Sequence, residues 1–356
     1  SPTMKSRMEE AAPMIVKGQD GGAAPPSPMR IGLIILMYLC LNSTLNLLNR
    51  YTLGHAGFRY PVSLTCFHLA FQTCSLTPLL MRPPYAGTHR EHLSRSWKPI
   101  ALIGVFMGLN IGLNNASLLH LSLSFNQIIR ASIPVVCAVC AVFVEKKVPT
   151  PAEGLGLLLV AAGVMGTITG SSYGTESTPN EFIGLAFCLI ATLSNALMMT
   201  FSGKIMGGEK LDALRLTFYT SPVTLGLLAP VSVGMEWDRM IERLGLPTPP
   251  GEEATFHTGS GLLTLVFLGC CNAVVYNWVH NKVIAVTSAT TTTVLGNVKV
   301  AMLVLFSRVL FGETKDWSWQ MLGGAVVALG GFALYSFAKL KAMRKAAAAA
   351  VRDEIR

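Results

Sequence analysis

The sequence predicts an all-α polytopic membrane protein with ten transmembrane helices, arranged as two inverted five-helix repeats. Three observations support this fold class. Of the 356 residues, 51% are hydrophobic and 13% are charged, whereas a soluble domain carries about 25% charged residues. The apolar residues come in blocks of about 20, the length that crosses a bilayer as a helix. Segments in the second half of the chain also repeat segments of the first half.

Each apolar block is expected to form one helical span, because backbone polar groups in lipid must be paired within their own segment. The ten expected spans are residues 31–50, 61–81, 98–119, 122–144, 152–170, 180–201, 211–233, 259–281, 283–310 and 317–339. The two long connections are residues 82–97 and 234–258. Residues 1–29 are rich in Pro, Gly and Ala and are expected to be disordered. Residues 341–356 form a basic tail that is expected to extend the last helix into water.

The basic residues predict the orientation of the chain. Most of the 28 Lys and Arg residues lie in even-numbered connections or at the two chain ends. Because basic flanks stay on the cytosolic side, both termini are expected in the cytosol. The formal charge of +9 does not indicate a nucleic-acid partner, since the basic residues flank apolar blocks and form no patch interleaved with aromatic residues.

The internal repeat relates spans three to five to spans eight to ten. The sequence FVEKK at residues 143–147 resembles FGETK at residues 311–315, and residues 115–122 resemble residues 281–288. Five spans in each half is an odd number, so the second half must enter the membrane inverted. Inverted repeats are typical of transporters, whose substrate site lies near the bilayer midplane where the repeats meet. The expected halves are residues 30–171 and 172–340.

Two basic residues lie inside the expected spans: Arg130 in the fourth and Lys299 in the ninth. A cation at this depth costs roughly 2.5–3.5 kcal/mol on insertion scales, so it faces protein or a watery cavity. The repeat places Arg130 and Lys299 opposite each other. Acidic residues are confined to span ends and loops, so structural ion pairing, the alternative role, finds almost no partner there. The two cations therefore predict a central anion site, most simply for phosphate or diphosphate.

Further polar residues at helical spacing extend the expected site. Asn126 lies one turn before Arg130, and Thr292 shares a helical face with Lys299. Asparagines in the first and third spans are additional cavity candidates: Asn42, Asn46, Asn49, Asn110 and Asn114.

Two more groups come from the second half of the chain. Tyr276 and Asn277 in the eighth span are expected to hydrogen-bond phosphate or sugar, and interhelical hydrogen bonding is the alternative. Residues of the seventh span before Pro222 are expected to meet the base or the other end of the substrate, with a simple proline kink as the alternative. These residues are Tyr219, Thr220 and Ser221.

No cofactor or metal is expected. The sequence has no zinc-type Cys/His spacing, no carboxylate pair inside the spans and no Ser/His/Asp arrangement, so an enzyme is disfavoured. Three histidines are expected to be hydrogen-bonded structural groups and not proton relays: His68, His120 and His280.

At these residues the chain resembles the triose-phosphate translocator and nucleotide-sugar transporter family of the drug/metabolite transporter superfamily. The resemblance covers roughly residues 31–342. Residues 124–132 (SFNQIIRAS) resemble the fourth-span motif whose basic residue binds phosphate in plastid translocators. Tyr276-Asn277 resembles the eighth-span Tyr-Asn. Residues 296–299 (GNVK) resemble the ninth-span motif that carries the substrate-phosphate lysine.

One departure from the family pattern bears on the substrate. Plastid phosphate translocators follow the ninth-span lysine with arginine, where this chain has Val300. The pattern of Lys followed by Val, Ala or Gly resembles that of a non-plastid branch of the family, some members of which carry UDP-sugars or UDP-uronic acids. Thr220 and Ser221 stand where GDP-mannose carriers have two asparagines, which disfavours a GDP-sugar.

The resemblance implies an antiporter that exchanges a cytosolic nucleotide sugar, with a UDP-sugar favoured, for a lumenal nucleoside monophosphate across the Golgi membrane. Two alternative functions stay open. One is an exchanger of small phosphorylated metabolites, such as triose phosphate or phosphoenolpyruvate, against phosphate. The other is a membrane receptor or scaffold without transport. An ER or plastid-type membrane is the alternative location. Membrane lipid is an expected partner, and the sequence leaves open both homodimer formation and the identity of the sugar and base.

Overall fold

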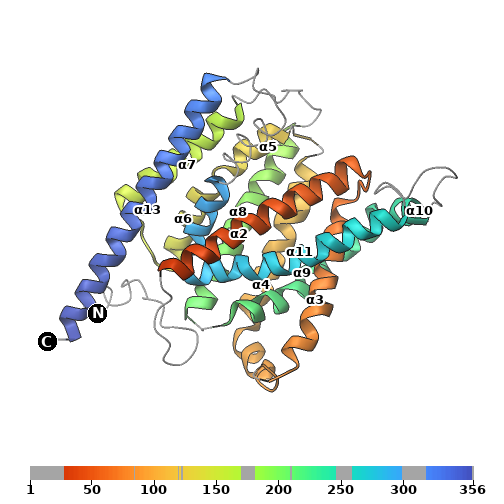
Figure 1. Ribbon diagram of the computed structural model, residues 1–356, viewed down its shortest axis with the longest axis horizontal. Helices are drawn as coiled ribbons and strands as arrows, with labels where there is room; N and C mark the ends of the chain where they lie inside the picture. Colours follow the sequence, from red (N-terminus) through yellow and green to blue (C-terminus); the bar gives the residue numbers. More distant parts are fainter. Residues whose placement is uncertain are drawn as a thin grey trace.

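The structure is a computed structural model that describes residues 28–83, 85–118, 120–121, 123–169, 181–208, 211–245, 259–298 and 318–354. Within these residues every regular element is a helix, which confirms the all-α prediction (Figure 1). The long helices are α2 (Pro28–Arg50), α3 (Pro61–Leu80), α4 (His89–Ser117), α7 (Pro151–Thr169), α8 (Glu181–Gly208), α9 (Ala213–Met235), α11 (Gly259–Val286) and α13 (Trp319–Glu354). The shorter helices are η1 (Tyr51–His55), α5 (Leu123–Arg130), α6 (Ile133–Val144) and α10 (Trp237–Gly245), and residues 289–298 are helical as well.

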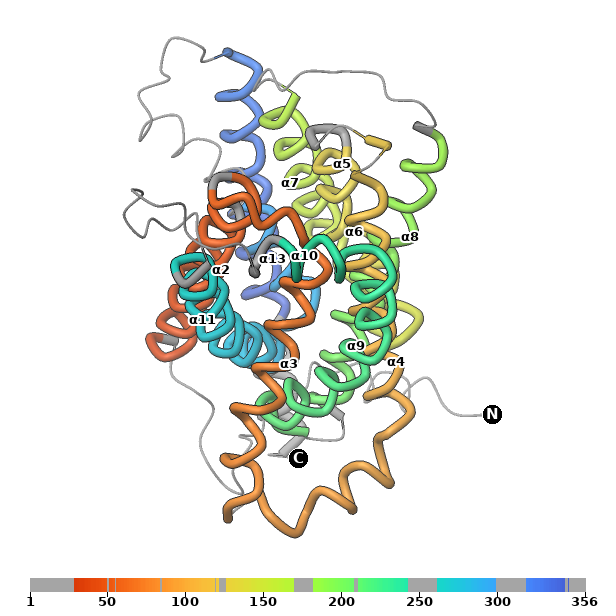
Figure 2. The backbone as a smooth tube through the Cα atoms, turned by 90° about the vertical axis from the view of Figure 1, so that its right-hand side faces the viewer, coloured from red at the N-terminus to blue at the C-terminus, as the bar shows by residue number. Residues whose placement is uncertain are grey.

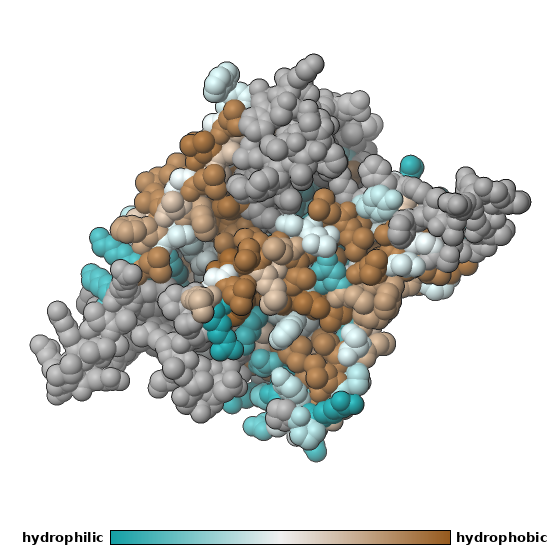
Figure 3. Space-filling view, viewed as in Figure 1, coloured by the Kyte–Doolittle hydropathy of each residue, from teal (hydrophilic) through white to brown (hydrophobic). Residues whose placement is uncertain are grey.

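Eight helical segments of the described chain are long and apolar enough to cross a membrane. They are Met29–Gly54, His89–Ser117, Asn126–Val144, Pro151–Thr169, Phe182–Gly207, Ala213–Met235, Gly261–Val286 and Trp319–Ala342. Helix α3 has a span's length but carries recurrent polar residues and is not among the eight. Of the expected ninth span, 283–310, residues 283–298 are described and the remainder lies outside the described residues. Apolar side chains cover much of the outer surface over α13 and α11 (Figure 3), as expected for a protein surrounded by lipid.

The helices pack in pairs drawn from the two halves of the chain. Helix α2 lies beside α11, and α4 lies beside α9 on the opposite side of the bundle (Figure 2). The other main pairs are α4 with α8, α3 with α9, α3 with α11, α6 with α8 and α7 with α13.

Glycines allow α7 and α13 to approach closely. A Cβ atom on Gly163 would come nearer to the backbone of Ala328 than real Cβ atoms do, and the same holds for Gly324 against the backbone of Thr167. Gly163 and Gly324 therefore allow the close helix packing that small residues permit between membrane helices. Three other glycines of α7 and α13 meet nothing within 4 Å: Gly154, Gly323 and Gly330.

The fourth expected span is broken and not continuous. Helix α5 ends at Arg130, and α6 begins at Ile133. Pro134 explains the break, because it has no N–H for the carbonyl of Arg130 and its ring clashes with that carbonyl in a continuous helix. Around the break, the Ser132 N–H donates to the Ile129 carbonyl at 3.1 Å, a tighter turn than the α-helix.

The connection at residues 234–258 contains a helix that the sequence pattern did not predict. In α10, Met240 is buried against the start of α11, while Trp237 and Ile241 are about half exposed. The element is amphipathic but only nine residues long, and so it gives a weak periodic signal. At the other end of the chain, α13 continues to Glu354, which agrees with the predicted extension of the last helix.

Candidate functional site

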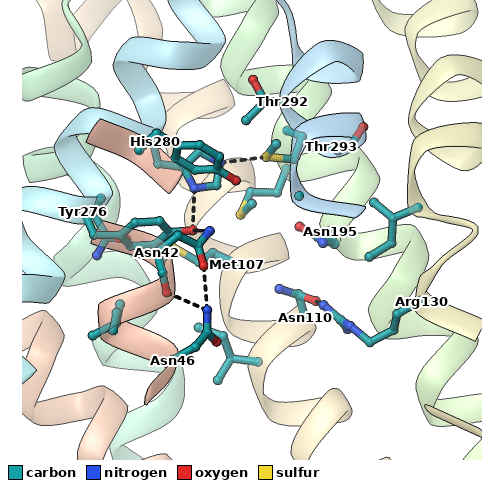
Figure 4. Close-up of a pocket in the computed structure, with 18 of the residues that line it drawn as sticks. Asn42, Asn46, Met107, Asn110, Arg130, Asn195, Tyr276, His280, Thr292 and Thr293 are labelled. Atoms are coloured by element: carbon teal, nitrogen blue, oxygen red, sulfur yellow. Dashed lines mark hydrogen bonds between the residues drawn. The ribbon is translucent and has the colours of Figure 1, made fainter. Parts of the chain in front are cut away.

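A cavity of about 400 Å³ lies at the centre of the bundle (Figure 4). This volume falls in the ~300–1,000 Å³ range of small-molecule sites. Its polar lining comprises Tyr38, Asn42, Asn46, Thr65, His68, Asn110, Gln127, Arg130, Asn195, Tyr276, Asn277, His280, Thr292, Thr293 and Asn297. Among the described lining residues, Arg130 alone carries a full charge, and none is acidic.

Arg130 enters the cavity from the last turn of α5. Its guanidinium donates to the amide oxygen of Asn110 at 3.1 and 3.2 Å and to that of Asn114 at 3.0 Å. Within the described part of the chain, no carboxylate lies within ion-pair distance of it. The partners of this cation are therefore neutral dipoles, and its charge is left for an anion.

An aromatic and amide cluster forms the facing wall of the cavity. The Tyr276 hydroxyl accepts from Asn42 Nδ2 at 3.2 Å and lies 3.1 Å from His280 Nδ1 (Figure 4). Asn46 Nδ2 donates to the side-chain oxygen of Asn42 at 2.6 Å. The Tyr38 ring stacks on Tyr276, with centroids 6.0 Å apart. This wall offers flat faces and hydrogen-bonding groups suited to a base or a sugar.

A second network of amides joins α3, α9 and α11 beside the cavity. Asn277 Nδ2 donates to Gln72 Oε1 at 2.7 Å, and Gln72 Nε2 in turn donates to Ser221 Oγ. Asn281 Nδ2 donates to Thr217 Oγ1 at 2.8 Å. A smaller cavity of about 60 Å³ borders the same amides. Asn277 and Asn281 thus hydrogen-bond between helices, the alternative considered for Asn277, while Asn277 also lines the main cavity.

The residues expected from the seventh span do not line the central cavity. Tyr219 is buried, and its hydroxyl lies 2.7 Å from His89 Nδ1, on the first turn of α4. Thr220 lines the smaller cavity and hydrogen-bonds back to the Leu216 carbonyl. Helix α9 continues through Pro222, so the proline does not divide this helix.

Of three other residues of the expected site, one lies outside the cavity lining, one lines the cavity and one lies outside the described residues. Asn126 is fully buried outside the cavity lining, and its amide donates to Ser117 Oγ at 2.7 Å. Thr292 lines the cavity and donates to the Ser288 carbonyl, just before the start of its helix. Lys299 lies outside the described residues, two positions beyond the cavity-lining Asn297.

Several cavity residues were not found from the sequence. Asn195 is an isolated amide inside an apolar span, and this feature of the sequence is a signal for a residue that lines a cavity. Gln127 and Asn297 lie in the two motifs already recognised, but no role was assigned to them. Tyr38 gave no periodic signal. His280 has partners in Tyr276 and the Met199 sulfur, as expected of a structural histidine. His68, by contrast, has a buried Nε2 with no hydrogen-bond partner.

No group of three or more metal-ligating side chains occurs among the described residues. Two of the carboxylates there have structural partners. Glu236 accepts the N–H groups of Val62 and Ser63 at the start of α3, and Glu153 lies 3.6 Å from Lys339.

Comparison with known proteins agrees with this architecture. A UDP-uronic acid transporter of Arabidopsis thaliana is 30% identical over 292 residues, which cover 81% of this chain and 89% of the relative. A probable sugar phosphate/phosphate translocator of the same plant is 29% identical, over 87% of this chain and 95% of the relative. A UDP-xylose transporter, also from Arabidopsis thaliana, is 25% identical over 87% and 84% of the two chains.

A solved crystal structure shares the fold, with a TM-score of 0.58 and 16% sequence identity over 86% of this chain and 98% of the other. The model of the Triose-phosphate Transporter family matches residues 29–336. These residues include the described cavity helices and both motifs with an intramembrane cation. The chain therefore belongs to the Triose-phosphate Transporter family, whose members are membrane transporters.

Proposed function

We propose that this protein is a nucleotide-sugar antiporter that exchanges a cytosolic UDP-sugar for a lumenal nucleoside monophosphate. The observation that carries the proposal is the set of hydrogen-bond partners of Arg130. Its guanidinium lies in a central cavity and is hydrogen-bonded only to neutral amide oxygens among the described residues. A phosphate would supply the missing negative charge and the bidentate geometry that a guanidinium favours.

Lys299 is proposed as the second phosphate-binding group. It follows the cavity-lining Gly296 and Asn297 in the sequence. In this proposal, two cations from different halves bind the phosphates. Because their mutual repulsion is relieved only when an anion is bound, the empty site reorients poorly, and an exchanger requires that property.

The wall opposite Arg130 favours a ligand larger than a simple sugar phosphate. Tyr38 and Tyr276 present stacked rings, and Asn42 and Asn46 add amide groups. Such a wall suits the base or the sugar of a nucleotide sugar. Relatives named as UDP-uronic acid and UDP-xylose transporters support uracil as the base. From the expected site, Tyr276, Asn277 and Thr292 are proposed as direct contacts. Tyr219, Thr220, Ser221 and Asn126 are proposed to act from outside the central cavity.

Alternating access between two inverted five-helix halves is the proposed mechanism. The packing pattern supports it. Consider replacing each helix by the one that lies five spans away in the chain. The pair α4 and α8 then becomes the pair α11 and α2, and the pair α4 and α9 becomes the pair α11 and α3. Both resulting pairs are present in the structure. The pairs α7 with α13 and α3 with α9 map onto themselves, and the counterpart of α6 with α8 would pair the ninth span with α2. Pairs that map onto one another in this way are what a two-fold relation between halves produces.

The amide network beside the cavity is proposed as one gate. Gln72 comes from the first half, whereas Ser221 and Asn277 come from the second, so their hydrogen bonds hold the two halves together next to the site. Separation of the halves would break these bonds and connect the main cavity with the smaller one. The even number of spans and the distribution of basic residues support cytosolic termini, and the Golgi membrane is the proposed location.

A ligand-stability screen tests the proposal. The purified protein is heated with UMP, GMP, CMP, AMP, inorganic phosphate or triose phosphate, and the thermal midpoint is recorded. Binding to the native state raises the midpoint in proportion to the logarithm of ligand excess. The expected result is stabilisation by UMP that exceeds stabilisation by phosphate or triose phosphate. Stabilisation by phosphate and triose phosphate without UMP would favour the second candidate, a sugar-phosphate exchanger, which the similarity to a sugar phosphate/phosphate translocator supports.

A further inference from the structure

The break between α5 and α6 leaves one backbone carbonyl that is served from the other half of the chain. In a continuous helix, the carbonyl of Ala131 accepts the N–H of Val135. Here that N–H donates to the Ser132 carbonyl at 2.9 Å instead. The Asn297 side chain replaces the Val135 N–H as the donor to the Ala131 carbonyl, with Asn297 Nδ2 lying 2.6 Å from the Ala131 oxygen. The exposed fractions are 7% for Asn297 and 3% for Ala131, and a buried carbonyl needs such a donor.

This hydrogen bond lies at the edge of the anion site. Ala131 follows Arg130 directly, and Arg130, Ala131 and Asn297 all line the central cavity. Asn297 and Ala131 are 166 residues apart, which is also the offset between the similar segments 115–122 and 281–288. The hydrogen bond therefore joins corresponding positions of the two halves of the chain, and it lies next to Arg130 of the first half.

We propose that Asn297 is a positioning residue for substrate binding. By holding the Ala131 carbonyl, it fixes the last turn of α5 and with it the direction from which Arg130 enters the cavity. The inference rests on the proposed function, in which Arg130 binds the substrate phosphate. An amide suits this role because it supplies an uncharged donor on a short side chain, whereas leucine has no donor and serine is too short to span the same gap.

Hydrogen exchange in the absence of ligand tests the positioning directly. Asn297→Leu removes the donor, and the peptide that covers the break at residues 131–136 is followed by mass spectrometry. We expect its exchange to quicken by about tenfold, since the break loses the hydrogen bond that Asn297 donates from the other half. Asn297→Gln keeps a donor, so the same peptide is expected to exchange more slowly in this variant than in the Leu variant. If the Leu variant does not fold, Asn297→Ser serves the same comparison.

Thr224→Val is the matched control. Thr224 Oγ1 donates to the Gly104 carbonyl at 2.9 Å, so it also makes a buried side-chain-to-backbone bond between two helices. It lies outside both described cavities. This variant is expected to lower thermal stability while leaving exchange at residues 131–136 unchanged. Unchanged exchange at the break in the Asn297 variants would overturn the positioning role.

A double-mutant cycle links the position to binding. UMP affinity is expected to fall about tenfold in Asn297→Leu, and not to fall further when the substitution is made in an Arg130→Met background. Fully additive losses would show that Asn297 does not act through Arg130. If the wild-type protein binds neither UMP nor phosphate, the proposed function fails, while the exchange measurement still decides whether Asn297 holds the break.

Discussion

Replacing Arg130 with methionine separates a binding role from a structural one. Methionine keeps much of the length of the side chain but removes its charge and its donors. The guanidinium now donates to Asn110 and Asn114, which are neutral. In the ligand-bound state, it would make charge-assisted hydrogen bonds to phosphate, each worth about 1.5–3 kcal/mol. Loss of one such bond corresponds to a decrease in UMP affinity of about 10- to 150-fold.

The stability of the unliganded protein should respond differently. A buried cation without a counter-charge carries a desolvation cost, so its removal does not sacrifice a favourable ion pair. The Arg130→Met variant is therefore expected to keep or raise its thermal midpoint without ligand while its UMP-induced shift shrinks. Arg215→Met is the matched control, because Arg215 contacts His92 and Thr88 outside the cavity and should leave UMP affinity unchanged. A lower unliganded midpoint with an unchanged UMP shift would refute the reasoning and make Arg130 structural.

Four further outcomes are expected. Lys299→Ala abolishes anion exchange in proteoliposomes while circular dichroism shows a folded protein; retained exchange removes Lys299 from the site. Tyr276→Phe loses the hydroxyl that accepts from Asn42, so UMP affinity falls about fivefold by calorimetry; an unchanged affinity limits Tyr276 to helix packing. Gln72→Leu weakens the proposed gate and raises uptake into empty proteoliposomes, and tight coupling in this variant contradicts the gate. Gly324→Leu forces α7 from α13 and lowers the thermal midpoint by several degrees; an unchanged midpoint argues against their close packing.

The sequence was sufficient to predict the helical membrane fold because hydropathy records burial in lipid directly. It also located Arg130 and Tyr276, since a charged or polar residue in the middle of an apolar span stands out. The break after Arg130 was not predicted, although Pro134 carries its signal. Proline also occurs in α9, where Pro222 leaves the helix continuous. Neighbouring helices decide between these outcomes, and their positions are not encoded in local sequence.

The side chains that surround the cavity were harder to predict. Tyr219 lies in a motif that suggested substrate contact, yet it hydrogen-bonds His89 at the end of the bundle. Asn297 stands in a recognised motif, but its partner is a backbone carbonyl 166 residues away. Contacts of this kind depend on which faces meet across the two halves. Helical spacing within one span identifies a face but not its partner.

Counterflow in proteoliposomes tests the central claim most directly. Vesicles containing the purified protein are loaded with UMP, with phosphate or with buffer alone, and uptake of labelled UDP-sugars and triose phosphate is measured. The account predicts that internal UMP accelerates UDP-sugar uptake and that Arg130→Met and Lys299→Ala lose this acceleration. Uptake of triose phosphate driven by internal phosphate, with no response to UMP, would contradict nucleotide-sugar exchange.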